Sequence, residues 1–248
     1  MTQHVSQAPQ LDSNGLRQAL RIAGGCTIGF TLCKLMNWPN GIFFTVYPML
    51  LLGLVPSINK GVIRQFVASA AYSAFIVLIL QGLFSHLPVL MTLIIFASFC
   101  ILFYLMSSGG AFLFGALGAV SLSIQLHFAS HVDQGSSIYP LILSNGMAIF
   151  ITIIIALLMH GLFPDVTARP MRAVPHKDKE SIRHEVLLCA SVATLSFEVF
   201  QVLDLQDSIS AQAASILILF SLCFKAAGTA SWQRIIGTLI GCNAALVA

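Results

Sequence analysis

Long apolar runs dominate this chain, and they constrain its fold more than any other feature. We distinguish about nine of them in 248 residues, and most approach the roughly 20 residues that an α-helix needs to cross a bilayer. Transmembrane β-strands would instead alternate apolar and polar side chains. Only 8% of the residues are charged, whereas soluble domains carry about 25%. The chain is therefore predicted to be an all-α, polytopic transmembrane helical bundle.

Short polar links separate most of the expected spans. The spans are roughly Leu16–Met36, Ile42–Ser57, Val62–Phe84, Leu87–Met106, Ala111–Phe128, Ile138–Phe163, Glu185–Leu203, Ile209–Lys225 and Trp232–Ala248. We expect a cytoplasmic tail at 1–16, a first six-span unit at 17–163, a longer cytoplasmic link at 164–184 and the start of a second unit at 185–248. The last span stops at Ala248 without a polar flank, so we expect further residues to follow it.

The Lys and Arg residues predict the orientation of the spans. If the N-terminus is cytoplasmic and every segment crosses, eleven of the 12 basic residues lie on the cytoplasmic side, and Lys34 is the exception. The shortest span, Ile42–Ser57, tests this arrangement. If it did not cross, Lys60, Arg64 and the long link would all move outside. The charge pattern therefore favours a crossing.

Two regions of the chain share a layout, which predicts an internal repeat. Each has a basic residue, about twenty apolar residues, a polar turn, an apolar span and a second basic residue. The first copy has its basic residues and turn at Arg17, Asn37–Asn40 and Arg64, and the second has them at Arg183, Asp204–Asp207 and Arg234. Six expected spans separate the two starts, so the copies would be parallel, an arrangement found in transporters. The second copy would include only its first three spans.

Ionisable residues inside a span are costly and are candidates for function. Lys34 lies near the outer end of the first expected span, and Glu198 lies at a similar height in the seventh, the matching helix of the repeat. The two could pair across the pseudo-twofold axis. Alternatively, Lys34 could meet an anionic substrate and Glu198 could carry a proton. A simpler interpretation is that both side chains extend to the outer interface.

The second expected span contains Thr45, Tyr47 and Pro48 near its middle. Proline has no N–H, so Pro48 frees a carbonyl near residue 44. Broken helices often form the binding site of secondary transporters. We therefore take these three residues as candidates for a substrate pathway, with a simple packing kink as the alternative.

The histidines suggest weaker possibilities. His127 and His131 are four residues apart, with Asp133 nearby, a spacing that could hold a metal on one helix face. The helix is expected to end there and no third ligand is fixed, so we predict no metal site and no cofactor. His160 is interpreted as an interfacial hydrogen-bonding residue. The chain also has no GxxxxGK[ST] nucleotide-binding motif, which leaves an ion gradient or a separate motor chain as the energy source for any transport.

A loose motif carries a family resemblance. Residues 232–241 read Trp-Gln-Arg-Ile-Ile-Gly-Thr-Leu-Ile-Gly, and the first copy has Trp38-Pro39 followed by Arg64 at the start of a span of small residues. This pattern resembles the fusaric acid resistance and aromatic acid exporter (FUSC-like) family of bacterial inner-membrane proteins. The motif positions are Arg64, Arg234, Gly237 and Gly241. The first copy departs from it, with Val67 and Ala71 where glycines would stand, and the short link matches only a compact branch.

The resemblance implies a multi-pass protein of the bacterial inner membrane that exports aromatic or other hydrophobic organic acids. It also implies proton drive, with a periplasmic adaptor protein and an outer-membrane channel as partners. A homo-oligomer is compatible with the sequence, whereas a net charge of +3 gives no reason to expect nucleic acid. The alternative is a non-transporting membrane scaffold subunit of an envelope complex. An intramembrane enzyme built on His127, His131 and Asp133 is a third hypothesis, and we do not expect enzymatic activity.

Overall fold

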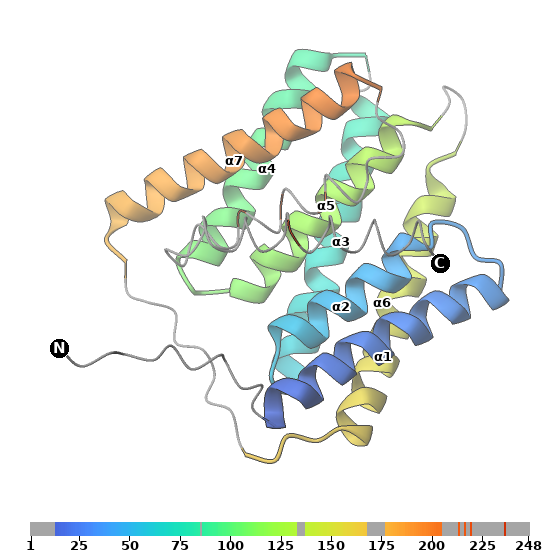
Figure 1. Ribbon diagram of the computed structural model, residues 1–248. Helices are drawn as coiled ribbons and strands as arrows, with labels where there is room; N and C mark the ends of the chain where they lie inside the picture. The colour runs from blue at the N-terminus through green and yellow to red at the C-terminus, as the bar shows by residue number, and fades with distance from the viewer. Residues whose placement is uncertain are drawn as a thin grey trace. The chain divides into compact units, whose positions relative to one another are not determined.

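The computed structural model describes residues 13–84, 86–132, 137–167 and 177–204, together with four isolated positions: Ala213, Ile216, Leu219 and Ile236. These residues form seven α-helices and no β-strand (Figure 1). The predicted all-α class is therefore confirmed for this part of the chain. Two compact units are formed, one from residues 1–64 and 139–173 and the other from residues 65–138 and 174–248. The expected division of the chain at the 164–184 link stays a prediction.

Among the described residues, five helices are long and apolar enough to cross a membrane. They are α3 (Lys60–Leu83), α4 (Pro88–Ser107), α5 (Phe112–Ser130), α6 (Tyr139–Leu162) and α7 (Lys179–Val202). They indicate a multi-pass membrane protein. Helix α7 begins six residues before the expected span, inside the predicted link.

The helices of the first two expected spans are not among these five long apolar helices. Helix α1 (Ser13–Leu35) has 23 residues but carries Arg17, Arg21 and Lys34, and it is not among the five. Helix α2 (Ile42–Leu54) has 13 residues, or roughly 20 Å at the helical rise, which is less than the hydrocarbon core of a bilayer. The eighth and ninth expected spans lie outside the described residues, apart from the isolated positions. Nine spans and the repeat therefore stay predictions.

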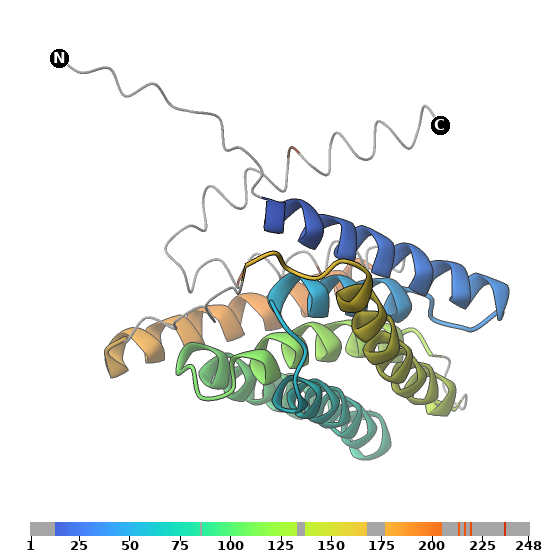
Figure 2. The same ribbon diagram turned by 90° about the horizontal axis from the view of Figure 1, so that it is seen from below.

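Unit 1 contains α1, α2, α6 and the first residues of α3. Helices α1 and α2 form a hairpin and lie side by side in both views (Figures 1 and 2). The chain reverses through Asn37 and Asn40, whose φ angles are 51° and 56°. Asparagine tolerates this left-handed backbone better than most residues. A hydrogen bond from the Trp38 N–H to the Cys33 carbonyl, at 3.0 Å, stabilises the turn.

Glycines on α1 allow the two helices of the hairpin to approach closely. A Cβ added to Gly29 would overlap the carbonyl oxygen of Phe44, and one added to Gly25 would lie 2.6 Å from Cδ1 of Leu52. The Phe44 carbonyl is the one that cannot receive a helical hydrogen bond from Pro48. The carbonyl that lacks this hydrogen bond therefore lies at the close contact between α1 and α2. Small residues permit such close contacts between helices in membranes.

Unit 2 contains most of α3 together with α4, α5 and α7. Helix α5 is buried along almost its whole length and contacts both α4 and α7. Here too a glycine lies against backbone, because a Cβ on Gly115 would overlap the Leu102 carbonyl oxygen of α4. The Ser73 hydroxyl of α3 donates to the Gly118 carbonyl of α5 at 3.2 Å. Helix α5 is therefore the central element of this unit.

Candidate functional site

One face of α1 carries polar residues in its first half and small residues in its second. Asn14, Arg21, Gly25, Gly29 and Cys33 are the buried residues of the helix. They are separated by seven or four residues, so they lie along one side. The sequence pattern therefore points both a guanidinium and two helix-packing glycines into the interior of unit 1.

The guanidinium of Arg21 forms a buried ion pair. Its Nη2 lies 2.6 Å from Oδ1 of Asp165, in the chain segment that follows α6. The Arg21 side chain is 2% exposed and that of Asp165 is 15% exposed. Nε of Arg21 is buried and has no hydrogen-bond acceptor. A buried arginine with one carboxylate partner depends strongly on that partner, because an unpaired charge in the interior is very costly.

Helix α1 also holds the rest of the segment that contains Asp165. The Asn14 amide donates to Oγ1 of Thr167 at 2.7 Å and accepts from the backbone N–H of Val166 at 2.9 Å. Arg17 donates to the Pro164 carbonyl at 2.5 Å. We call residues 164–167 the carboxylate strap. It is tied to the polar half of α1 by hydrogen bonds and by the Arg21 ion pair.

Two further side chains bind the end of α2 and the residues after it. Gln18 donates to the carbonyls of Gly53 and Leu52, at 3.0 and 3.3 Å. His160 of α6 lies 3.3 Å from the Pro56 carbonyl and 2.9 Å from the carbonyl of Ala156. The start of α1, the end of α2 and the end of α6 therefore meet in one polar region. His160 therefore has hydrogen-bond partners, while its expected place at the membrane interface stays a prediction.

The candidates on α2 lie within the core of unit 1. Tyr47 is buried, and its hydroxyl donates to Oδ1 of Asn145 on α6 at 2.5 Å. The Thr45 hydroxyl lies 3.4 Å from the Gly41 carbonyl of its own helix. Pro48 is buried against the glycines of α1. This placement favours the packing interpretation of Pro48, while a pathway role for all three residues stays a prediction.

Glu198 lies on α7 in unit 2 and Lys34 lies on α1 in unit 1. Glu198 is half-buried and accepts a hydrogen bond from Thr92 of α4 at 2.6 Å. It forms no ion pair with any residue that the structure describes. Lys34 is exposed, and its Nζ lies 5.7 Å from the centroid of the Phe30 ring. The expected pairing of Lys34 with Glu198 stays a prediction.

The paired histidines lie at the end of α5. Nδ1 of His131 is 2.8 Å from the His127 carbonyl, and Nε2 of His131 is 3.6 Å from Oδ1 of Asp204, just beyond α7. Asp133 lies outside the described residues. Within the described ranges, no group of three or more His, Cys, Asp or Glu side chains is arranged to hold a metal. Imidazole and carboxylate groups thus gather where α5 and α7 end.

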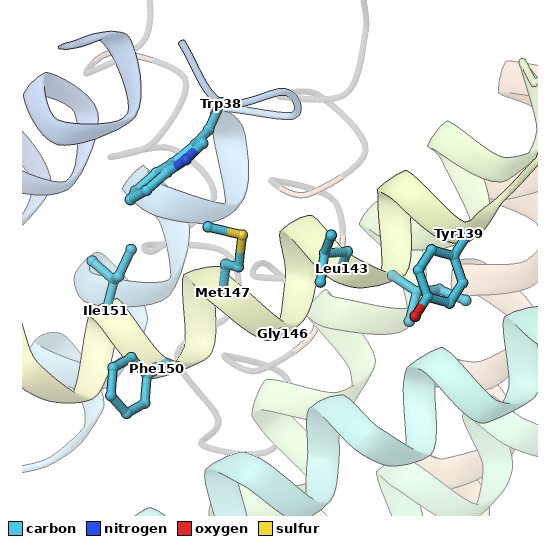
Figure 3. A pocket seen from close by; sticks show the side chains of 8 residues that line it. Trp38, Tyr139, Leu143, Gly146, Met147, Phe150 and Ile151 are labelled. Atoms are coloured by element: carbon cyan, nitrogen blue, oxygen red, sulfur yellow. The ribbon is translucent and has the colours of Figure 1, made fainter. Parts of the chain in front are cut away.

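An apolar groove of about 660 Å³ runs along α6 in unit 1 (Figure 3). The Trp38 ring, from the turn after α1, covers one end of it, and its other walls come from α6. Its lining residues are Trp38, Tyr139, Ile142, Leu143, Gly146, Met147, Phe150 and Ile151. Tyr139, Leu143 and Phe150 are exposed, so the groove opens to the surface of the unit. Such a surface suits lipid or another apolar group and contains no charged residue.

The motif residues are only partly described. Arg64 is exposed near the start of α3, and Val67 and Ala71, where the motif would have glycines, are exposed on the same helix. Arg234, Gly237 and Gly241 lie outside the described residues. The motif therefore receives no structural test from the second copy.

Comparison with known families covers most of the first six helices. Residues 18–159 match a family of proteins of unknown function, DUF2955. The chain belongs to this family. No curated protein and no solved structure matches the chain. The matched region includes Arg21, Tyr47 and Asn145 but ends before Asp165 and Glu198, and the family description does not name the exporter family that the motif resembles.

Proposed function

We propose that this protein is a bacterial inner-membrane secondary exporter of hydrophobic organic acids, with aromatic acids as the leading class, driven by protons. The observation that carries the proposal is Glu198. It is a half-buried carboxyl group on an apolar helix, with the hydroxyl of Thr92 as its partner and no basic partner in the described structure. An ionisable group inside the membrane is a candidate functional residue by default, and carboxyl groups in such positions often relay protons.

The position of Glu198 suits proton exchange. The carboxyl lies four residues before the end of α7, on the side that packs against α4. The Thr92 hydroxyl can donate to the carboxylate or accept from the protonated acid, so it supports both states. His131 and Asp204 lie at the same end of unit 2, where α5 and α7 finish. These groups provide further sites through which a proton could reach the surface.

The proposed topology keeps the N-terminus in the cytoplasm. The orientation of α3 does not depend on whether α1 and α2 cross, because a hairpin that enters and leaves on one side gives α3 the same orientation as two crossings. The proposal of a parallel repeat gains one support from the backbone. Asn37 and Asp204 each stand two residues beyond the end of their helix, α1 or α7, with φ of 51° and 48°.

The partners in this proposal follow from the resemblance to FUSC-like proteins. They are an organic anion as substrate, the lipid bilayer, a periplasmic adaptor protein and an outer-membrane channel. A homo-oligomer is compatible with the arrangement. The basic residues expected on the cytoplasmic face would raise the local concentration of anionic substrate there.

The decisive experiment is efflux of labelled weak acids from cells that carry the gene. We expect faster efflux of labelled aromatic acids than from cells with an empty vector, and loss of the difference when the proton gradient is collapsed. Glu198→Gln should abolish the proton-driven part. Glu180→Gln, at an exposed carboxylate in the first turn of α7, is the matched control and should leave efflux unchanged.

Efflux equal to that of the empty vector across the whole panel would contradict the proposal. The same cells would then be examined for a stable protein complex, which the scaffold alternative requires. Efflux that persists in Glu198→Gln at the wild-type rate would keep transport but remove Glu198 as the proton site.

A further inference from the structure

We infer that Arg21 is a binding site for the carboxylate of the substrate, and that Asp165 occupies this site when substrate is absent. The inference rests on the proposed function for the class of ligand, a hydrophobic carboxylic acid. It assigns recognition of the acid group to unit 1 and identifies the carboxylate strap as an internal competitor.

The first argument is that one nitrogen of the Arg21 guanidinium, Nε, has no hydrogen-bond acceptor. Nε and Nη2 of an arginine lie on one edge and together bind both oxygens of a carboxylate. In Arg21, Nη2 is bound by Oδ1 of Asp165, whereas Nε is buried and has no acceptor. A buried donor without a partner is rare and costly. A carboxylate that binds both nitrogens would satisfy the edge more fully than Asp165 does.

The second argument is that the strap is attached in a reversible way. Pro164, Val166 and Thr167 are exposed, and hydrogen bonds and the ion pair join the strap to α1. Because these three side chains already face the surface of unit 1, release of the strap from α1 would newly expose little of their apolar surface. Exchange of one carboxylate for another also keeps the buried guanidinium paired, which avoids the main cost of opening such a site.

The third argument is the apolar character of the next turn. A Cβ on Gly24 would lie 3.1 Å from Sδ of Met159, and one on Gly25 would approach Leu52 and Ile155. These side chains of α2 and α6 lie one turn along α1 from Arg21. Methionine adapts its shape readily. These contacts are close, so the apolar body of a bound acid requires Met159 to move, and the apolar surroundings then favour such an acid over a small inorganic anion.

The test measures binding directly, without transport. The full chain, purified in lipid nanodiscs, is titrated with labelled benzoate. Benzamide, an uncharged analogue of similar shape, is added in a parallel titration. We expect Arg21→Gln to weaken benzoate binding about tenfold or more, and Asp165→Asn to strengthen it about tenfold, because the internal competitor loses its charge. Benzamide should not compete. A purely structural ion pair would give no gain in affinity in Asp165→Asn.

A milder variant keeps the inference testable if Asp165→Asn does not fold. Thr167→Ala removes the hydroxyl that binds Asn14 and leaves the ion pair in place. It should strengthen benzoate binding about threefold, since the strap is released more easily. Thr27→Ala, at an exposed threonine on α1 that bonds only to its own helix, is the control and should bind as the wild type does. Wild-type affinity in Arg21→Gln, or no gain in Thr167→Ala, would overturn the inference.

The two proposals fail in different ways. Glu198→Gln should bind benzoate normally while losing export. Export that depends on Glu198, combined with benzoate binding that ignores Arg21, would remove the inference and leave the function. Binding that depends on Arg21 in a protein that exports no acid from cells would keep the site and remove the exporter proposal.

Discussion

Unit 1 and unit 2 each hold an ionisable side chain on a helix that faces protein, and they stabilise it differently. Arg21 in unit 1 is almost fully buried and is neutralised by the carboxylate of Asp165. Glu198 in unit 2 is half-buried and is bound by the neutral hydroxyl of Thr92. A permanently charged guanidinium needs a counter-charge in the interior, whereas a carboxyl group can also exist in a neutral form. This difference in partners is the reason that we propose anion binding for unit 1 and proton exchange for unit 2.

The largest expected effect comes from removing the counter-charge in unit 1. Asp165→Ala should lower the free energy of unfolding by about 3 kcal/mol, because it leaves Arg21 buried and unpaired. The melting temperature of the purified protein in detergent measures this. The double variant Arg21→Gln with Asp165→Ala should recover most of the loss. A stability loss in the double variant as large as in the single one would show that the ion pair is not the cause.

The next effect tests the close contact between α1 and α2. Gly29→Ala should destabilise unit 1 by about 2–3 kcal/mol, since the added methyl group would overlap the Phe44 carbonyl oxygen and the backbone must move. Gly161→Ala on α6, where a Cβ meets nothing within 4 Å, is the matched control. It should be neutral or slightly stabilising, by up to about 1 kcal/mol. Equal melting temperatures for the two variants would argue against this packing.

Removing the buried tyrosine hydroxyl should have a smaller effect. Tyr47→Phe leaves Oδ1 of Asn145 without this donor inside unit 1, which costs about 1–2 kcal/mol. Tyr104→Phe, at an exposed tyrosine of α4, removes the same atom and should change the melting temperature little. A similar shift in both variants would mean that the hydroxyl group matters for a reason other than the bond to Asn145.

The smallest expected effect concerns the hydrogen bond between Thr92 and Glu198 in unit 2. Thr92→Val keeps the shape of the side chain and removes the hydroxyl that binds Glu198. We expect a stability loss of about 1 kcal/mol, together with slower proton-driven export. Thr92→Ser should restore the wild-type export rate. An unchanged rate in Thr92→Val would exclude this hydroxyl from proton exchange.

Regular spacing explains what could be predicted in the first helix and what could not. The pair of glycines Gly25 and Gly29 on α1 and the proline at position 48 are visible in the sequence, but their contact is not. In the sequence, Arg21 counts only as one of the basic residues that predict the orientation of the spans. Its seven-residue spacing from Asn14 and its four-residue spacing from Gly25 place it on the buried face, and this signal was available. Its partner could not be found in this way, because Asp165 lies 144 residues further along the chain.

The sequence alone predicts a helical, multi-pass membrane protein, because apolar runs with so few charges can satisfy their backbone only as helices inside lipid. It also identifies Glu198 and Tyr47 as unusual residues within those runs. The partners of these two residues depend on the tertiary structure. Thr92 and Asn145 lie 106 and 98 residues away in the chain, and helix periodicity carries no information over such distances. Only the packing of α4 against α7, and of α2 against α6, brings these groups together.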